Sequence, residues 1–519
     1  MGWLSFIVFL PIAAALAMLA APARYRVLFR LVSVATTALT LLGALHVFFW
    51  FNPNASGMQY ETAAGWVSAL GAGFHLGVDG LSVSLLLMAA ITAFSAAAVS
   101  REIERREKEY YILLMLMVGG VFGMFCALDL LLFFFFHELA LIPTFLLVGG
   151  WGRGSNRLYA AYKMTIYLMI GSLFVLAAIL LLYAKTGFRT LDMPSLCAYL
   201  KARPLAEADQ RTVFGLFLFG FGVLAGLWPF HTWAPPGYSA APTGPAMLHA
   251  GVLRKFGLYG LIRVALPMAP RGAEAWLPAL GILCFGNILY CGLAAARQKD
   301  LDDVIGYSSL AHVGFVFLGL AAFSVLGLTG AAVVMVAHGF FAALAFGLNG
   351  YLYQRFETLD RDRLGGLLQA MPFAGGVALM ALFAGCGLPG FAGFPGEVMV
   401  LFGAWKWARW AAAAAAFGGL VIAAVYMLRV ARDVWQGPLP RRLAAQAADI
   451  VNPWHRFGYL LPLAALLWFG IFPETLLSRV RPAARSVMEK VAGQREQSAA
   501  GRPFVDGTGG WRNREGKTD

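Results

Sequence analysis

Apolar runs of about twenty residues recur along the whole chain, and they constrain its fold more than any other feature. A helix needs about 20 apolar residues to cross a bilayer, and in lipid only helices and closed barrels satisfy every backbone hydrogen bond. Of the 519 residues, 60% are hydrophobic and 13% are charged, against roughly 25% charged in soluble domains. The sequence therefore predicts an all-α polytopic membrane protein.

We expect about 14 transmembrane helices from this pattern. The predicted spans are Trp3–Ala20, Leu31–Phe51, Leu81–Val99, Tyr110–Ala127, Leu130–Val148, Met164–Tyr183, Val213–Phe230, Met247–Leu266, Leu277–Ala295, Val304–Ala322, Leu328–Tyr351, Phe373–Trp405, Trp410–Leu428 and Phe457–Phe472. The first lacks a basic segment before it and a clear cleavage site after it, so we interpret it as a retained span rather than a signal peptide. Beyond these spans, Leu476–Val491 is predicted as a short interfacial helix, and the composition indicates disorder from Gln494 onward.

The basic residues gather in short loops, which accounts for a net charge of +13. They follow the first, third, fifth, ninth, eleventh and thirteenth spans, whereas the loop Asn52–Asp79 contains no Lys or Arg. Because Lys and Arg mark cytoplasmic loops, we interpret the charge as a topology signal and predict no nucleic-acid partner. Both termini are then expected on the outer face, although the partly basic loop Lys185–Arg211 argues against this orientation.

The sequence predicts no cofactor and no metal site. The five cysteines form no CxxC pair, so no iron–sulfur, zinc or disulfide framework follows. They are Cys126, Cys197, Cys284, Cys291 and Cys386. There is no Gly-rich nucleotide fingerprint after a strand and no Walker loop, and the histidines lack metal-ligand spacing such as HxxxH.

Two segments rich in proline and glycine interrupt the helical pattern, at Trp228–Met247 and at Gly385–Val398. Irregular backbone at membrane depth is tolerated where it lines protein or water, and paired broken spans indicate the ion path of a transporter. The breaks fall in the seventh and twelfth spans, an odd offset, so a repeat with that offset must be inverted. The expected divisions are helices 1–3 (1–109), a first repeat of helices 4–8 (110–268), a second repeat (269–430), a last span (431–477) and a polar tail (478–519).

Three lone charges lie inside apolar runs, namely Glu138, Lys255 and Glu397. A charge at the bilayer centre costs roughly 2.5–3.5 kcal/mol on insertion scales, so each needs a partner, water or a task. Burial disfavours the charged form of a carboxyl or ammonium group, which can then gain or lose a proton. The structural alternatives are a hydrogen bond to a neighbouring helix for Glu138, snorkelling for Lys255 and stabilisation by a helix dipole for Glu397.

Three histidines lie within or at the edge of predicted spans, namely His231, His312 and His338. A lone buried histidine is usually structural, but imidazole donates at one nitrogen and accepts at the other, which suits a proton relay. We therefore predict a proton wire, in chain order, of Glu138, His231, Lys255, His312, His338 and Glu397.

Four other polar residues receive weaker interpretations. His249 is a weaker candidate for the same relay, and Asp79 and Asp129, at span edges, are interpreted as helix caps or interface pairs. His137 projects about 100° away from Glu138 on a helix and need not share its role.

Several motifs occur in one order between about Gly77 and Phe402. They are LDLLLFFFFHELALIPTFLLVGGWG, WPFHTWAPPGYSAAPTGP, LRKFGLYGLIRVALP, DLDDVIGYSSLAHVGFVFLG, MVAHGF and LPGFAGFPGEVMVLFG. In this combination the chain resembles the antiporter-like subunits of proton-pumping NADH–quinone oxidoreductase (respiratory complex I). A short polar tail, and Glu397 within PGEV, resemble the M-type members of that family more than the L-type members.

The resemblance implies 14 helices, two inverted five-helix repeats and broken helices 7 and 12. It implies proton translocation coupled to quinone reduction in other subunits of the enzyme, with L- and N-type antiporter-like subunits as neighbours in the bilayer. By position, Glu138 matches the fifth-helix acid, Lys255 the central lysine and Glu397 the exit acid, while His231, His312 and His338 match the relay histidines.

The chain also departs from this family's pattern. Leu224 stands where the family places the lysine that pairs with the fifth-helix acid, and Val213–Phe230 contains no Lys or Arg. Either Arg254, Lys163 or His137 provides the pairing, or the channel pumps poorly. The sequence also leaves open a homologous subunit of a multi-subunit cation/proton antiporter or of a membrane-bound hydrogenase, and a structural subunit that does not conduct.

Overall fold

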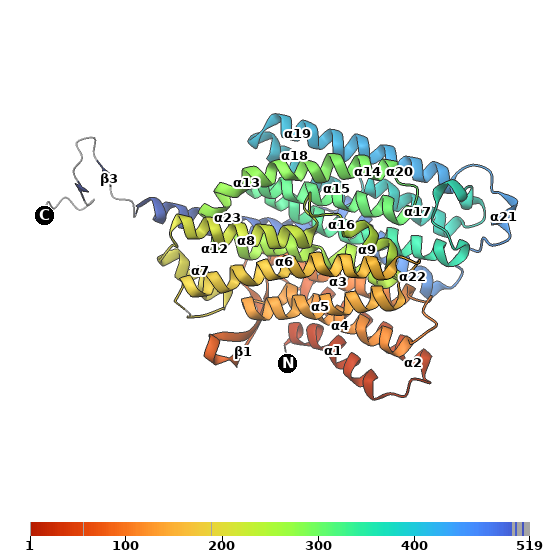
Figure 1. Ribbon diagram of the computed structural model, residues 1–519, viewed down its shortest axis with the longest axis horizontal. Coiled ribbons are helices and arrows are strands. Elements are labelled where there is room, and N and C mark those ends of the chain that lie inside the picture. Colours follow the sequence, from red (N-terminus) through yellow and green to blue (C-terminus); the bar gives the residue numbers. More distant parts are fainter. Residues whose placement is uncertain (1, 56, 188, 501–503, 506–510, 513–519) are drawn as a thin grey trace.

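The computed structural model is a bundle of long helices. It describes residues 2–55, 57–187, 189–500, 504–505 and 511–512. Figure 1 shows the long helices lying side by side along the long axis of the molecule, with β1, α7 and α12 at one end and α21 at the other. This arrangement confirms the all-α class, and the side chains buried inside the bundle form one continuous apolar core.

The elements follow the chain in this order. Up to the first break they are α1 (Trp3–Ala20), α2 (Arg26–Phe49), β1 (Gln59–Val67), η1 (Ser68–Leu70), β2 (Ala72–Val78), α3 (Gly80–Val99), α4 (Glu107–Cys126), α5 (Leu130–Trp151), α6 (Arg157–Lys185), α7 (Met193–Ala202) and α8 (Glu207–Ala225). Up to the second break they are α9 (Ala234–Ala240), α10 (Thr243–Leu248), η2 (His249–Leu253), α11 (Lys255–Gly260), η3 (Leu261–Ala265), α12 (Leu266–Met268), α13 (Pro270–Phe285), η4 (Gly286–Cys291), α14 (Gly292–Arg297), α15 (Leu301–Ala321), α16 (Val325–Phe356), η5 (Arg361–Arg363), η6 (Leu367–Gln369) and α17 (Pro372–Gly385). The remainder are α18 (Gly393–Trp407), α19 (Arg409–Ala416), η7 (Phe417–Ile422), α20 (Ala423–Val430), η8 (Ala431–Trp435), α21 (Arg441–Ala444), α22 (Pro453–Ile471), α23 (Glu474–Ala500), β3 (Phe504–Val505) and β4 (Trp511–Arg512).

Ten helices among the described residues are long and apolar enough to cross a membrane. The pair α22 and α23 passes the same test together but bends by 75° between the two helices. The other predicted spans fall on α8, whose first turns are charged, and on interrupted segments such as α17 and α18. The count of 14 spans and the two inverted repeats therefore remain predictions.

Both predicted breaks are present. After α8 the chain leaves helical geometry at Gly226, which adopts a left-handed φ of 78°, and resumes as α9 at Ala234. Between α17 and α18 the irregular segment contains Gly387 and Gly390, with φ values of 69° and 97°. A side chain disfavours positive φ, so glycine suits both breaks.

The eighth predicted span is continuous but is wound loosely on both sides of Lys255. The segments η2 and η3 are π-helical and flank the single α-helical stretch α11. In η2 the amide of Arg254 donates to the carbonyl of His249, five residues back, at 3.3 Å. The carbonyl of Ala250 thereby loses the amide that would pair with it in an α-helix.

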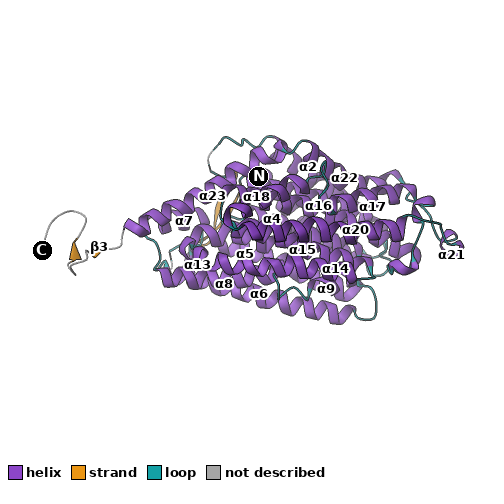
Figure 2. Ribbon diagram, turned by 90° about the horizontal axis from the view of Figure 1, so that it is seen from above, coloured by secondary structure: helices purple, strands orange, loops and turns teal. Residues whose placement is uncertain are grey.

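A β-hairpin and helix α7 lie at one end of the bundle (Figure 2). Strands β1 and β2 pair antiparallel, with Ala63 opposite His75. His75 joins the hairpin to α7, because its ring nitrogens lie 2.7 Å from Asp192 and 3.1 Å from Glu61. Burial lowers the pKa of His75, but the hydrogen bonds and negative charges of Asp192 and Glu61 outweigh burial and raise it.

A helix is present where the interfacial helix is predicted, and it is longer than expected. Helix α23 runs from Glu474 through Gln494 to Ala500, so the expectation of disorder from Gln494 is wrong for this stretch. Its buried residues recur at helical spacing, including Leu476, Val480, Ala484 and Val487, and form one apolar face against the bundle. That packing stabilises the part of the helix that lies before Gln494. Most of the tail after Ala500 lies outside the described residues.

Gly80 provides a test of how α23 is attached. A methyl group at this position would collide with the backbone carbonyl of Arg479 in α23, so we expect Gly80→Ala to displace the helix at a cost of about 1–3 kcal/mol. Hydrogen exchange of the α23 amides should accelerate, measured by mass spectrometry. Gly376→Ala is the control, because a methyl group there meets no atom within 4 Å. Equal exchange in Gly80→Ala and the parent would contradict this packing.

Candidate functional site

Lys255 lies at the centre of the bundle with 1% of its surface exposed. Its Nζ donates to the freed carbonyl of Ala250 at 2.9 Å and lies 2.7 Å from Nδ1 of His338 on α16. An ammonium group has three donors and no acceptor, so Nδ1 of His338 is the accepting nitrogen when Lys255 is charged. This contact can pass a proton from the amine to the imidazole.

His338 continues the hydrogen-bonded chain through a serine. Its Nε2 lies 2.8 Å from the hydroxyl of Ser309 on α15. Nη2 of Arg254 donates to the same hydroxyl, and the Arg254 guanidinium lies over the ring of Tyr238 at 5.5 Å. Ser309 therefore joins the fixed charge of Arg254 to the ring that faces Lys255.

His312 and Glu397 extend this network toward the second break. The rings of His338 and His312 are 5.6 Å apart, and Nε2 of His312 lies 3.9 Å from Oε1 of Glu397. Nδ1 of His312 lies 2.8 Å from the carbonyl of Ser308, so Nδ1 carries the hydrogen and Nε2 can accept a proton. A cavity of about 10 Å³ lined by these three titratable side chains separates them, which is about the room that one water needs.

Glu397 lies one turn inside α18 rather than at its first residue. Only 4% of its surface is exposed, and Oε2 has no hydrogen-bond partner. A methyl group on Gly387 in the second break would collide with this oxygen. The break therefore leaves space for the carboxyl group, which faces the protein interior.

Glu138 lies apart from this network, on α5. Its side chain is 29% exposed, and its Oε1 lies 3.3 Å from Nδ1 of His137. The two adjacent side chains thus meet, although helical geometry alone directs them apart. Lys163, another proposed partner, instead lies 5.9 Å from the ring of Tyr159.

His231 is not joined to the other predicted relay residues by a hydrogen bond among the described residues. It lies in the first break, 3% exposed, near the rings of Tyr290 and Tyr307 at 5.5 and 6.5 Å. Its Nδ1 has no hydrogen-bond partner. The structure therefore brings together Lys255 and three of the predicted relay residues but leaves His231 and Glu138 at a distance.

Asp79 and Asp129 serve as helix caps, as one of their two interpretations predicted. Asp129 accepts from the amides of Leu131 and Leu132 at the start of α5, at 2.8 and 3.1 Å. Asp79 caps α3 and forms an ion pair with Arg263 at 2.5 Å.

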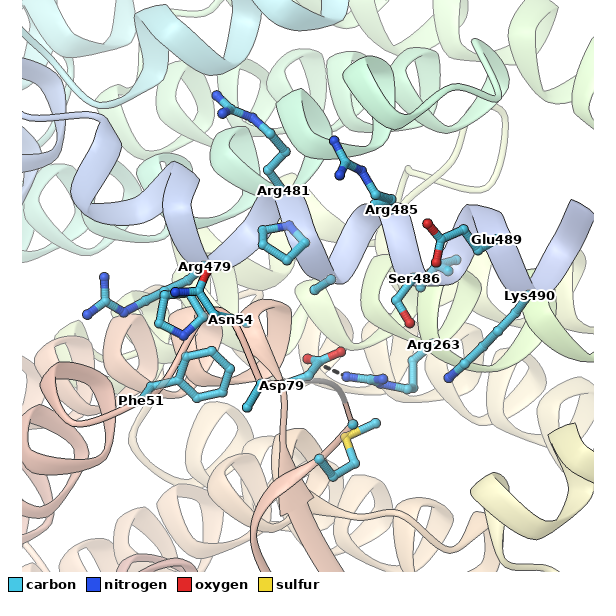
Figure 3. Close-up of a pocket in the computed structure, with 18 residues that line it drawn as sticks. Phe51, Asn54, Asp79, Arg263, Arg479, Arg481, Arg485, Ser486, Glu489 and Lys490 are labelled. Atoms are coloured by element: carbon cyan, nitrogen blue, oxygen red, sulfur yellow. Dashed lines mark ion pairs between the residues drawn. The ribbon is translucent and has the colours of Figure 1, made fainter.

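The Asp79–Arg263 pair lies beside a cavity of about 370 Å³. Figure 3 shows Arg263 directed at Asp79, with Ser486 and Lys490 of α23 on the other side. The pair therefore ties the start of α3 to the middle of η3, beside α23, which is a structural role.

The DLDD segment forms a second cavity, of about 510 Å³, at the opposite end. Asp300 caps α15 by accepting from the amide of Asp302 at 2.8 Å. The buried carboxyl group of Asp302 lies 3.5 Å from Arg153 and 3.0 Å from the amide of Asn349. The acids of this loop are thus held in place by the polar side chains around them.

Sequence reasoning missed the hydroxyl groups of the network. Ser309 joins His338 to Arg254, and Ser308 accepts from Tyr426 at 3.1 Å. The paired serines four and three residues before His312 were the available signal. Among the described residues no group of three or more His, Cys, Asp or Glu side chains is placed to hold a metal ion, and all five cysteines are free.

The chain is similar to known proteins in both sequence and fold. The family model described as NADH:quinone oxidoreductase/Mrp antiporter, transmembrane, matches residues 127–423. NADH-quinone oxidoreductase subunit M of Rhodobacter capsulatus is 34% identical over 94% of this chain and 96% of that protein. NAD(P)H-quinone oxidoreductase chain 4 1 of Picosynechococcus is 35% identical over 84% of this chain and 83% of that protein.

Chains in two solved structures have the same fold as this protein. A chain of respiratory complex I from Thermus thermophilus superposes with a TM-score of 0.85 at 31% identity, over 94% of this chain and 99% of that one. A chain of the Mrp complex from Dietzia superposes with a TM-score of 0.82 over 94% of this chain and 99% of that one, at 19% identity, which shows the fold alone. The protein is therefore a multi-pass membrane protein that belongs to the NADH:quinone oxidoreductase/Mrp antiporter family.

Proposed function

We propose that this chain is a proton-translocating membrane subunit of an NADH–quinone oxidoreductase. The observation that carries the proposal is the contact between Lys255 and His338, inside a line of buried titratable groups that ends at Glu397. Relatives above 30% identity over most of the chain are M-type subunits of such enzymes. Electrons then move in other subunits, and this chain moves protons.

The residues divide the proton path into steps. Lys255 holds a proton and passes it to Nδ1 of His338, 2.7 Å away. His312 receives it through the small cavity that it shares with His338 and Glu397, and Glu397 releases it. Each transfer breaks one N–H or O–H bond and forms another, which suits groups that can be either charged or neutral at moderate cost.

The partners follow from the family. Other membrane subunits of the oxidoreductase adjoin this chain, and we propose L- and N-type antiporter-like subunits as its immediate neighbours, in the plasma membrane of a bacterium. The division into helices 1–3, two five-helix repeats and a last span is part of the same proposal. A role in a cation/proton antiporter has the weaker support, because that likeness rests on 19% identity.

Replacing Lys255 tests the central step. In Lys255→Ala we expect the initial rate of NADH-driven proton uptake into inverted vesicles to fall by about tenfold or more, because no other amine occupies this site. Assembly is verified on native gels and by electron transfer from NADH to a water-soluble acceptor. Lys406→Ala, an exposed lysine on α18, is the control. An assembled Lys255→Ala complex with the parent's proton uptake would refute the proposed function.

Replacing Glu397 tests the end of the line. Glu397→Gln keeps the size of the side chain but cannot release a proton, so we expect proton uptake to fall by about tenfold or more while assembly is unchanged. Glu104→Gln, in an exposed loop position, should leave uptake at the parent's rate. If Glu397→Gln pumps normally and Lys255→Ala does not, the path leaves the network before Glu397.

A further inference from the structure

Glu138 has one basic neighbour. Among the described residues, His137 is the only histidine, lysine or arginine whose side-chain nitrogen lies within 4 Å of the Glu138 carboxyl oxygens, at 3.3 Å. The Glu138 oxygen that faces it is buried and makes no hydrogen bond to His137 or to any other described residue, so the 3.3 Å approach is an ion-pair contact. A half-buried carboxylate needs such a partner to stay ionised or to exchange a proton, so the pairing of Glu138 depends on the adjacent residue.

His137 also lines a cavity that it shares with Arg254, the residue before Lys255. The cavity has a volume of about 10 Å³, and its polar lining consists of His137 from α5, His249 from η2 and Arg254. Leu224 of α8 forms part of its apolar wall. A water molecule needs roughly 10–15 Å³ and two or more polar partners, so both the space and the partners for one water are present.

The polar side chains around this cavity have unused hydrogen-bonding capacity. Nδ1 of His249, and Nε and Nη1 of Arg254, are buried without a hydrogen-bond partner in the protein. The exposed fractions of His249 and Arg254 are 3% and 1%. Buried polar groups are nearly always paired with protein or ordered water, so these three atoms point to a bound water molecule.

We propose that His137 is the proton-exchanging partner of Glu138, and that a water molecule in this cavity connects it to His249 and Arg254. The proposal rests on the proposed function and adds an electrostatic connection between Glu138 and Lys255. From Arg254, hydrogen bonds continue through the hydroxyl of Ser309 to His338 and Lys255. This part of the connection carries no proton, because a guanidinium does not deprotonate in proteins.

A proton moves from Glu138 to His249 in three transfers. Glu138 gives its proton to Nδ1 of His137, and the ring releases a proton from its other nitrogen to the water. The water passes a proton to Nδ1 of His249, which has a free position. Arg254 keeps its charge throughout, because a guanidinium does not deprotonate in proteins, so it acts as a positioning residue that orients the water.

Leu224 explains why the basic partner of Glu138 in this chain is His137 of α5 rather than a residue of α8. Its side chain packs over Gly171 of α6 and closes the cavity with carbon atoms. A lysine at position 224 would instead bring an ammonium group to the same cavity. His137 and Leu224 therefore supply alternative positions for one positive charge, and this makes a rescue experiment possible.

The experiment compares His137→Phe with His137→Phe/Leu224→Lys in the assembled complex, using NADH-driven proton uptake in inverted vesicles. We expect His137→Phe to lower uptake by about tenfold or more, because phenylalanine cannot transfer a proton, and the double variant to recover most of it. A merely structural role for His137 would not be rescued by a cation on another helix. His455→Phe is the matched control, because His455 is 8% exposed against 6% for His137 and lies on α22.

The outcomes separate this proposal from the function itself. If His137→Phe takes up protons at the parent's rate, His137 is not the proton-exchanging partner of Glu138 and the proposal is overturned. Lys255→Ala, measured in parallel, reports whether the chain pumps at all. A loss in His137→Phe that Leu224→Lys does not restore also overturns it. If His137→Phe fails to assemble, His137→Gln replaces it, since an amide keeps a hydrogen bond but cannot be protonated, and parent-level uptake in that variant overturns the proposal.

Discussion

The structure depends on keeping one ammonium group inside an apolar bundle. Lys255 is 1% exposed, and its Nζ faces a carbonyl and an imidazole rather than a carboxylate. Burying an ion without partners is costly, and neutral acceptors reduce that cost less than a carboxylate would. The amine is therefore held firmly in position but its proton is held loosely. A salt bridge would have stabilised the charge more and hindered its transfer.

Irregular backbone makes this arrangement possible. The π-helical η2 frees the carbonyl of Ala250 for the ammonium group. Close approach of η2 to α16 depends on two glycines, since a methyl group on Gly251 would lie 3.0 Å from the carbonyl of Gly339. Gly339 follows His338, so the contact sets the imidazole against Lys255. The glycines and the π-helical turn thus position the site, and larger residues would separate its two halves.

Sequence reasoning found the parts of this site but not all of their connections. Hydropathy located the ten long apolar helices among the described residues, and proline and glycine located both breaks, because those signals are local. The interior charges Lys255 and Glu397 stood out for the same reason. The link through Ser309 depends on how α15 and α16 pack, and the meeting of His137 with Glu138 depends on side-chain rotamers, so neither follows from spacing. His231 differs, because its place in the chain order predicts a relay role, whereas the first break places its ring near Tyr290 and Tyr307, with no hydrogen bond to another predicted relay residue among those described. That role stays a prediction.

Arg254 gives the two halves of the network a means of influencing each other without a large movement. It is a permanent positive charge next to Lys255 in sequence, and Ser309 connects it to His338. In the proposed mechanism, an ionised Glu138 offsets part of Arg254's field and favours a proton on Lys255. A neutral Glu138 leaves that field uncompensated, which favours transfer of the Lys255 proton toward His338 and Glu397. Because interactions between buried charges are screened less than those in water, a proton at one end of the line changes occupancy at the other.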